Sequence, residues 1–141
     1  MTNLPPMRQL EEDLRTAGQL TSDDIRALAR DGVKTLIFNR PDQETEDQPA
    51  TQELQKTAEE LGLHWVHQPV ISGQVSDEEG REFGRIYAQA PKPVVAFCRS
   101  GARCGCLWAL SKKDQESGEA LVAKMQAAGF DMPDFFKRLL A

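Results

Sequence analysis

The sequence has few of the residues that usually build disulfide frameworks or metal sites. Only three cysteines and two histidines occur in 141 residues. Three cysteines cannot all pair with one another, so we expect reduced thiols rather than a disulfide scaffold. A zinc site built from Cys98, Cys104, Cys106 and a histidine would have poor ligand spacing. We therefore expect neither a metal ion nor a cofactor.

Long apolar runs and an excess of basic residues are missing as well. No apolar run approaches the ~18 residues that are needed to span a bilayer. The net charge of −5 argues against nucleic acid or an anionic membrane as a partner. Residues 1–6 lack a basic start followed by an apolar stretch, so we expect no secretion signal and a cytoplasmic location.

The residues that are present predict one α/β domain over 1–141, with 1–7 flexible. The chain is long enough for one core, and 40% of its residues are hydrophobic. Capping residues and glycine or proline stops mark helices that alternate with short apolar segments. Helices are expected at about 22–31, 53–61, 77–90, 103–112, 118–128 and 133–140, and strands at 33–38, 64–70 and 94–97 after a small edge hairpin. This alternation predicts a mostly parallel central sheet with helices on both faces, a three-layer arrangement.

The most informative segment is an apolar strand, 94–97, that ends at Cys98-Arg99-Ser100-Gly101-Ala102-Arg103. A thiol placed before a helix N-terminus meets backbone N–H groups and the helix dipole, which favour the thiolate. The same N–H groups can bind an oxyanion, and an arginine can hold it from the side. We predict that Cys98 and Arg103 are catalytic. The anion-binding groups are expected to be Arg99, Ser100, Gly101, Ala102, Cys104 and Arg40.

Alternatives stay open for two of these residues. Cys104 directly follows Arg103; it is either a helix residue without chemistry or a resolving thiol for Cys98. Arg40 either binds the substrate anion, braces its loop through Asp42 or forms a surface ion pair. The acidic run over 42–47 predicts a solvated loop.

The Cys98 loop resembles the active loop of rhodanese-type sulfurtransferases. It also resembles the cradle of cysteine-dependent phosphatases, in which five rather than four residues separate cysteine and arginine. Further motifs resemble the phosphatase-like domain of the beta-lactamase hydrolase-like proteins over residues 8–139. These motifs are Ala17-Gly18-Gln19-Leu20-Thr21, Ile37-Phe38-Asn39-Arg40-Pro41-Asp42, His67-Gln68-Pro69-Val70 and Leu107-Trp108-Ala109-Leu110.

The resemblance implies a tyrosine-phosphatase-like α/β fold that carries a rhodanese-length loop. Members of the family have been described both as candidate phosphatases and as sulfur transferases. Some are fused to a persulfide-oxidising metallo-hydrolase domain, which implies a persulfide dioxygenase-type partner. The resemblance to this family therefore does not determine which of the two reactions is catalysed.

The reaction depends on whether a general acid is available to protonate a leaving oxygen. The segment after Val70 reads Ile71-Ser72-Gly73 and holds no carboxylate. The next acidic residue, Asp77, lies in a helix start signal and is the possible general acid. Glu78 and Asp42 are the alternatives for this role. Thiolate attack on a sulfane sulfur needs no such acid.

The sequence thus favours a sulfurtransferase that carries a persulfide on Cys98, with thiosulfate or a persulfide as donor and a thiol as acceptor. The alternative is a phosphatase that forms a cysteinyl-phosphate on Cys98 from a phosphate ester. A second alternative is a redox- or anion-sensing module.

Overall fold

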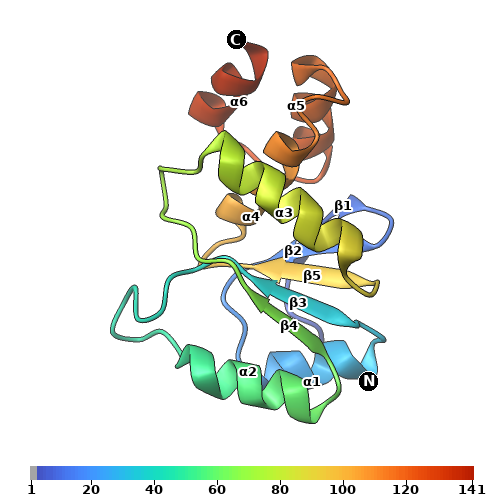
Figure 1. The fold of residues 1–141 in the computed structure, drawn as a ribbon, viewed down its shortest axis with the longest axis vertical. Helices are drawn as coiled ribbons and strands as arrows, with labels where there is room; N and C mark the ends of the chain where they lie inside the picture. Colours follow the sequence, from blue (N-terminus) through green and yellow to red (C-terminus); the bar gives the residue numbers. More distant parts are fainter. Residues whose placement is uncertain (1–2) are drawn as a thin grey trace.

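The structure is a computed structural model that describes residues 3–141, and its centre is one five-stranded sheet in the order β1-β2-β5-β3-β4 (Figure 1). The strands are β1 (Met7–Glu11), β2 (Leu14–Ala17), β3 (Thr35–Phe38), β4 (His64–His67) and β5 (Val94–Phe97). β1 and β2 pair antiparallel, whereas all the other pairs are parallel. The predicted edge hairpin and mostly parallel sheet are confirmed.

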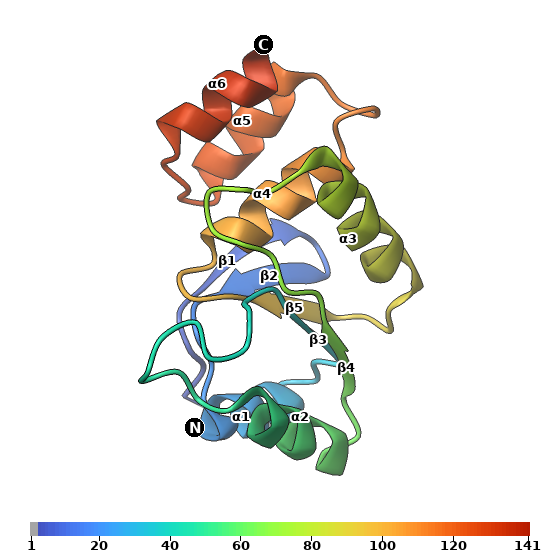
Figure 2. The same ribbon diagram turned by 60° about the vertical axis from the view of Figure 1, so that its left-hand side comes forward.

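Helices cover both faces of this sheet. They are α1 (Ser22–Arg30), α2 (Thr51–Glu60), α3 (Asp77–Gln89), α4 (Ala102–Ser111), α5 (Gly118–Ala127) and α6 (Pro133–Leu140). α1 and α2 lie on one face and α3 and α4 on the other, while α5 and α6 pack beyond α4 (Figure 2). The predicted three-layer arrangement is confirmed, with the α5–α6 pair added outside it.

Helix starts follow the capping signals of the sequence. Thr21 and Asp24 form a reciprocal capping box at α1, and Ser76 and Glu79 form one at α3. The Ser117 hydroxyl accepts the Ala120 N–H at the start of α5. None of the helices within residues 3–141 is both long and apolar enough to cross a membrane.

The first strand overlaps by one residue the segment that was expected to be flexible. Met7 is the first residue of β1, although it falls in the segment 1–7 expected to be flexible. Residues 1 and 2 lie outside the described residues, and the flexibility of this segment stays a prediction.

The parallel strands end in register at one edge of the sheet. Phe97 in the fully buried β5 lies opposite Ala17 of β2 and Phe38 of β3, and Phe38 lies opposite His67 of β4. The loops that follow these strands therefore meet at the carboxyl edge, on the left in Figure 1. Ligands of open α/β sheets bind at this edge.

Candidate active site

Cys98 follows β5 directly and is fully buried. Gly101 adopts φ 92° and precedes the first turn of α4, a left-handed conformation that glycine reaches without strain. Its N–H donates to the Cys98 Sγ at 3.1 Å. A Cβ at Gly101 would lie 3.3 Å from the carbonyl oxygen of Ala17, so the loop also sits tightly against β2. The loop thus aims backbone donors at the sulfur, as its sequence predicts.

These surroundings favour the Cys98 thiolate. The Cys104 thiol is the largest contribution that lowers its pKa, helped by the backbone N–H groups of Cys104 and Gly101 and by the charge of Arg103; burial opposes them. The resulting pKa is about 5, well below the usual 9.0, so Cys98 is ionised at neutral pH. Burial instead raises the pKa of the Cys104 thiol, and it raises that of Cys106 to about 12.

The Arg103 guanidinium is buried and held by two acceptors. Its Nη1 and Nη2 donate to the two carboxylate oxygens of Glu44 at 2.8 and 2.9 Å, and Nη1 also donates to the Val70 carbonyl oxygen at 3.0 Å. This end-on pair leaves the Nε–H edge outside the contact with Glu44. The guanidinium also faces the Cys98 sulfur: the Glu44 hydrogen bond raises the Arg103 pKa most, burial opposes it, and the negative charge of Cys98 raises it further. A substrate oxyanion attached to the sulfur would therefore meet the remaining N–H groups.

Arg40 lies on the other side of the same carboxylate. It is 3% exposed and donates to Glu44 Oε1, Gln19 Oε1 and Thr45 Oγ1, each at 2.9 Å. Asp42 instead accepts from the Thr51 hydroxyl. Arg40 therefore braces its loop through Glu44 and not through Asp42, and it does not form the surface ion pair that was one expectation.

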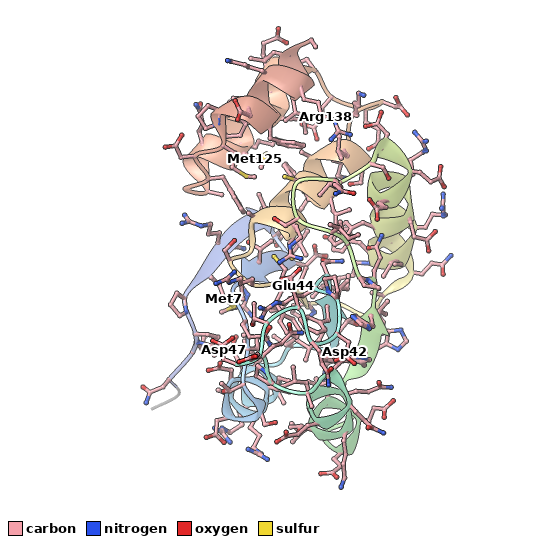
Figure 3. All side chains as sticks on the ribbon, turned by 90° about the vertical axis from the view of Figure 1, so that its left-hand side faces the viewer. Met7, Asp42, Glu44, Asp47, Met125 and Arg138 are labelled. Atoms are coloured by element: carbon pink, nitrogen blue, oxygen red, sulfur yellow. The ribbon has the colours of Figure 1, made fainter. Side chains whose placement is uncertain are left out.

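Glu44 is the residue of this site that the sequence analysis missed. Its pKa is lowered to about 2, mainly by the Arg103 hydrogen bond and then by Arg40, with burial opposing. Glu44 belongs to the loop between β3 and α2, and Figure 3 shows it in front of the carboxyl edge of the sheet, which faces the viewer. The acidic run over 42–47 was expected to be solvated, and nothing in its composition singles out the one carboxylate that turns inward.

Two residues with amide side chains, Asn39 and Gln19, also organise the site, although the sequence analysis predicted no chemical role for them. The side chain of buried Asn39 donates to the Gln68 backbone oxygen at 3.0 Å, which points its Oδ1 at the Cys104 Sγ, 3.3 Å away. Gln19 joins Arg40 to the loop, because its backbone N–H donates to the Arg99 carbonyl oxygen at 3.1 Å. Both residues occur in motifs that carried the family resemblance, which was the only available signal.

The remaining predicted residues are placed less centrally. Arg99 and Ser100 are exposed, and the Ser100 hydroxyl accepts from Ala102 N at 3.3 Å. The hydrogen bonds of Asp77 within residues 3–141 go to Lys113 and Arg138 at 3.0 and 2.6 Å rather than to the Cys98 loop. These partners lower the Asp77 pKa, the Arg138 bond most of all, and hold it as a carboxylate. Its assignment as general acid stays a prediction that this ion-pair arrangement disfavours.

Removing the Cys104 thiol should change the ionisation of Cys98. The single Cys104 thiol hydrogen can go to Asn39 Oδ1 or to the Cys98 sulfur, and a thiolate is the stronger acceptor. We expect Cys104→Val to raise the Cys98 pKa from about 5 by roughly one unit, measured by the ultraviolet absorbance of the thiolate against pH. Cys104→Ser, which keeps a donor, should stay close to the parent. An unchanged midpoint in Cys104→Val would show that Cys104 has no part in stabilising the thiolate.

The fold and the loop define a class. The mostly parallel five-stranded sheet has a tyrosine-phosphatase-like fold. A cysteine and an arginine lie on either side of the N-terminus of the helix that follows the central strand. The chain belongs to the family described as beta-lactamase hydrolase-like protein, phosphatase-like domain, whose sequence model matches residues 6–117. The predicted resemblance is confirmed.

Curated relatives and solved structures agree with this placement. Beta-lactamase hydrolase-like proteins from Xylella fastidiosa and Agrobacterium fabrum are 31% and 32% identical over 87% and 92% of this chain. The matched regions are 29% and 28% of those relatives, so the chain spans less than a third of their length. A candidate phosphatase from Neisseria meningitidis is 34% identical with a TM-score of 0.84, covering 94% of both chains. The core catalytic domain of a PP-IP phosphatase from S. cerevisiae shares the fold at 14% identity with a TM-score of 0.76, covering 99% of this chain and 86% of that one.

Proposed function

We propose that the protein is a cysteine-dependent phosphatase that hydrolyses phosphate monoesters through a cysteinyl-phosphate on Cys98. The observation that carries the proposal is the Cys98 thiolate beside the Gly101 N–H and facing Arg103. An ionised sulfur at neutral pH is a nucleophile, and a nest of N–H groups with a guanidinium suits a phosphoryl group. The phosphatase-like family and the related structures support hydrolysis above sulfur transfer, which reverses the order favoured by the sequence.

The two steps can be written with the residues of the site. The Cys98 sulfur forms a bond to phosphorus while the bond from phosphorus to the ester oxygen breaks, and the released oxyanion takes a proton from water. Water then attacks the phosphorus of the cysteinyl-phosphate, and the sulfur–phosphorus bond breaks. This step regenerates the Cys98 thiolate and releases inorganic phosphate and a proton. Arg103 and the backbone N–H groups of the loop hold the phosphoryl oxygens in both steps.

Turnover of an aryl phosphate and of thiosulfate, measured side by side, tests this proposal. We expect the purified protein to release phosphate from para-nitrophenyl phosphate faster than it transfers sulfur from thiosulfate to a thiol. Sulfur transfer that clearly exceeds phosphate release would instead establish the second candidate function.

Sulfur transfer is retained because one observation favours it. No carboxylate follows Val70 before the start of α3, and Asp77 is held in ion pairs. In this reaction the Cys98 sulfur attacks the outer sulfur of thiosulfate, the sulfur–sulfur bond breaks and sulfite leaves without needing a proton. An acceptor thiolate then takes the terminal sulfur from the persulfide and regenerates Cys98. The loop spacing of four residues is consistent with this smaller adduct.

Neutralising Asp77 should leave catalysis almost unchanged. Its partners Lys113 and Arg138 lie at a partly exposed surface, so Asp77→Asn is expected to alter kcat by less than about twofold and stability by at most about 1 kcal/mol. Steady-state hydrolysis of para-nitrophenyl phosphate against pH measures this. A general acid would instead show a loss of about 10²-fold and a missing alkaline limb of the pH profile. That result would restore Asp77 to the catalytic machinery.

A further inference from the structure

We propose that the cavity between the Cys98 loop, the segment after β4 and α6 binds the apolar body of the substrate, and that the substrates are aryl phosphate monoesters. This inference rests on the proposed phosphatase function and names its substrate class. The cavity has a volume of about 530 Å³, which is within the usual range for a small organic ligand. Ala102 and Arg103 line it on the side of the loop, so a group bound there adjoins the anion-binding site.

The lining favours an apolar group. Val75, Met132 and Phe135 contribute apolar surface, and Cys106 contributes a thiol that burial keeps protonated. Phe135 is partly exposed on α6 and contributes aromatic surface to the lining, while the Arg138 guanidinium lies over its ring, 5.9 Å from the centroid. An aryl group of one or two rings would therefore find complementary surface in this cavity.

The charges at the cavity argue against a substrate with several phosphates. Arg138, on α6 above the loops in Figure 3, donates to the Val75 carbonyl oxygen and to Asp77, both at 2.6 Å, and is therefore already paired. The other charged side chain in the lining besides Arg103 is the acidic Asp134. A second phosphate would meet no uncommitted cation there and would face a carboxylate.

The chemistry of the leaving group points to the same class independently. Glu44, the carboxylate that touches Arg103, is ionised, and Asp77 is held as a carboxylate by two cations. Without a group that donates a proton, the ester oxygen must leave as an anion. An aryloxide is a far weaker base than an alkoxide, so aryl esters are the monoesters that this site can cleave efficiently.

The cavity wall supplied by α6 lies outside residues 6–117, the part of the chain that the family model matches. Met132 and Phe135 belong to this C-terminal segment, whereas Cys98 and Arg103 belong to the matched domain. We therefore assign aryl selectivity to Met132 and Phe135, and phosphoryl chemistry to Cys98 and Arg103 in the matched part of the chain. The two assignments can fail separately.

Equilibrium binding to the full chain carrying Cys98→Ser tests the cavity without turnover. We expect 2-naphthyl phosphate to bind about tenfold more tightly than inorganic phosphate, and Phe135→Ala to remove most of this preference while the affinity for inorganic phosphate stays the same. Met132→Ala should reduce the preference in the same direction. Lys137→Ala, an exposed change on the same helix, is the matched control and should keep it.

Four results decide the proposal. Equal affinities for the two ligands in Cys98→Ser would overturn the inference, and so would an unchanged preference in both Phe135→Ala and Met132→Ala. If Phe135→Ala lowers the melting temperature and weakens the binding of both ligands, the result for Met132→Ala decides. A naphthyl preference that depends on Met132 and Phe135, together with no hydrolysis of naphthyl phosphate by the parent protein, would support the cavity and refute the proposed phosphatase function.

Discussion

Replacing Cys98 with serine is expected to lower kcat/KM for para-nitrophenyl phosphate by at least about 10³-fold. The Cys98 thiol has a pKa of about 5, so it is a nucleophilic anion at neutral pH. A serine hydroxyl in the same place stays protonated, and within residues 3–141 no histidine or carboxylate is hydrogen-bonded to Cys98 to take its proton. Because the loop, Arg103 and the cavity are unchanged and the negative charge of the thiolate is removed, inorganic phosphate should bind Cys98→Ser at least as tightly as the parent. Steady-state kinetics combined with phosphate binding measures both quantities.

The pH profile of the parent protein provides an internal check on this result. Only the deprotonated sulfur attacks, so activity should rise as the pH passes upward through about 5 and then level off. Cys106→Ser is the matched control, because the Cys106 thiol remains protonated and faces the neighbouring cavity. Substantial hydrolysis by Cys98→Ser, with Cys106→Ser indistinguishable from it, would remove Cys98 from the reaction.

The fold follows from local signals that act over a few residues. The capping boxes at Thr21 and Ser76 and the glycine stops at Gly32 and Gly62 mark helix ends by hydrogen bonding and by positive φ, which need no tertiary information. The order of the strands in the sheet could not be predicted from such local signals. β5 is central because it is apolar on both faces, but its pairing with both β2 and β3 depends on packing between distant segments.

The site was predictable only where its residues are neighbours in the chain. Cys98, Gly101 and Arg103 share one loop, so their spacing and the following helix predict the nest. The pair between Arg103 and Glu44 joins residues 59 positions apart, and a carboxylate in a run of acidic residues gives no sign of turning inward. The cavity against α6 could not be predicted from the sequence for the same reason, since it forms between Arg103 and residues some thirty positions later, such as Phe135.

Neutralising Glu44 should produce the largest loss of stability among the loop residues. Its carboxylate, one quarter exposed, is the shared counter-charge of Arg40 and Arg103, whose side chains are 3% and 7% exposed. Glu44→Gln keeps the shape but removes the carboxylate that the two buried guanidinium groups share, which typically costs about 3 kcal/mol or more. Denaturant unfolding at neutral pH measures the difference. Glu46→Gln, in the same exposed loop, is the matched control and should lie close to the parent.

The sign of the pH dependence makes this prediction specific. Folding lowers the Glu44 pKa from 4.5 to about 2, so the carboxylate adds its full stability above pH 4.5 and loses it as the pH falls through about 2. The stability gap between the parent and Glu44→Gln should therefore be constant near neutrality and close progressively between these two values. A gap that is unchanged across this range would show that the substitution acts through packing and not through charge.

The same substitution decides how Glu44 affects catalysis. In the positioning interpretation, Glu44 takes the end-on edge of Arg103 and fixes the remaining N–H groups toward the Cys98 sulfur. Glu44→Gln should then lower kcat/KM by about 10- to 100-fold, mostly through kcat, because a misaligned clamp loses more transition-state stabilisation than substrate binding. If Glu44 instead competes with the substrate for Arg103, the substitution would lower KM and raise kcat/KM. Since Val70 also holds Nη1 of Arg103 and would remain in place, the guanidinium should stay near the sulfur in either case, and the direction of the change separates the two roles.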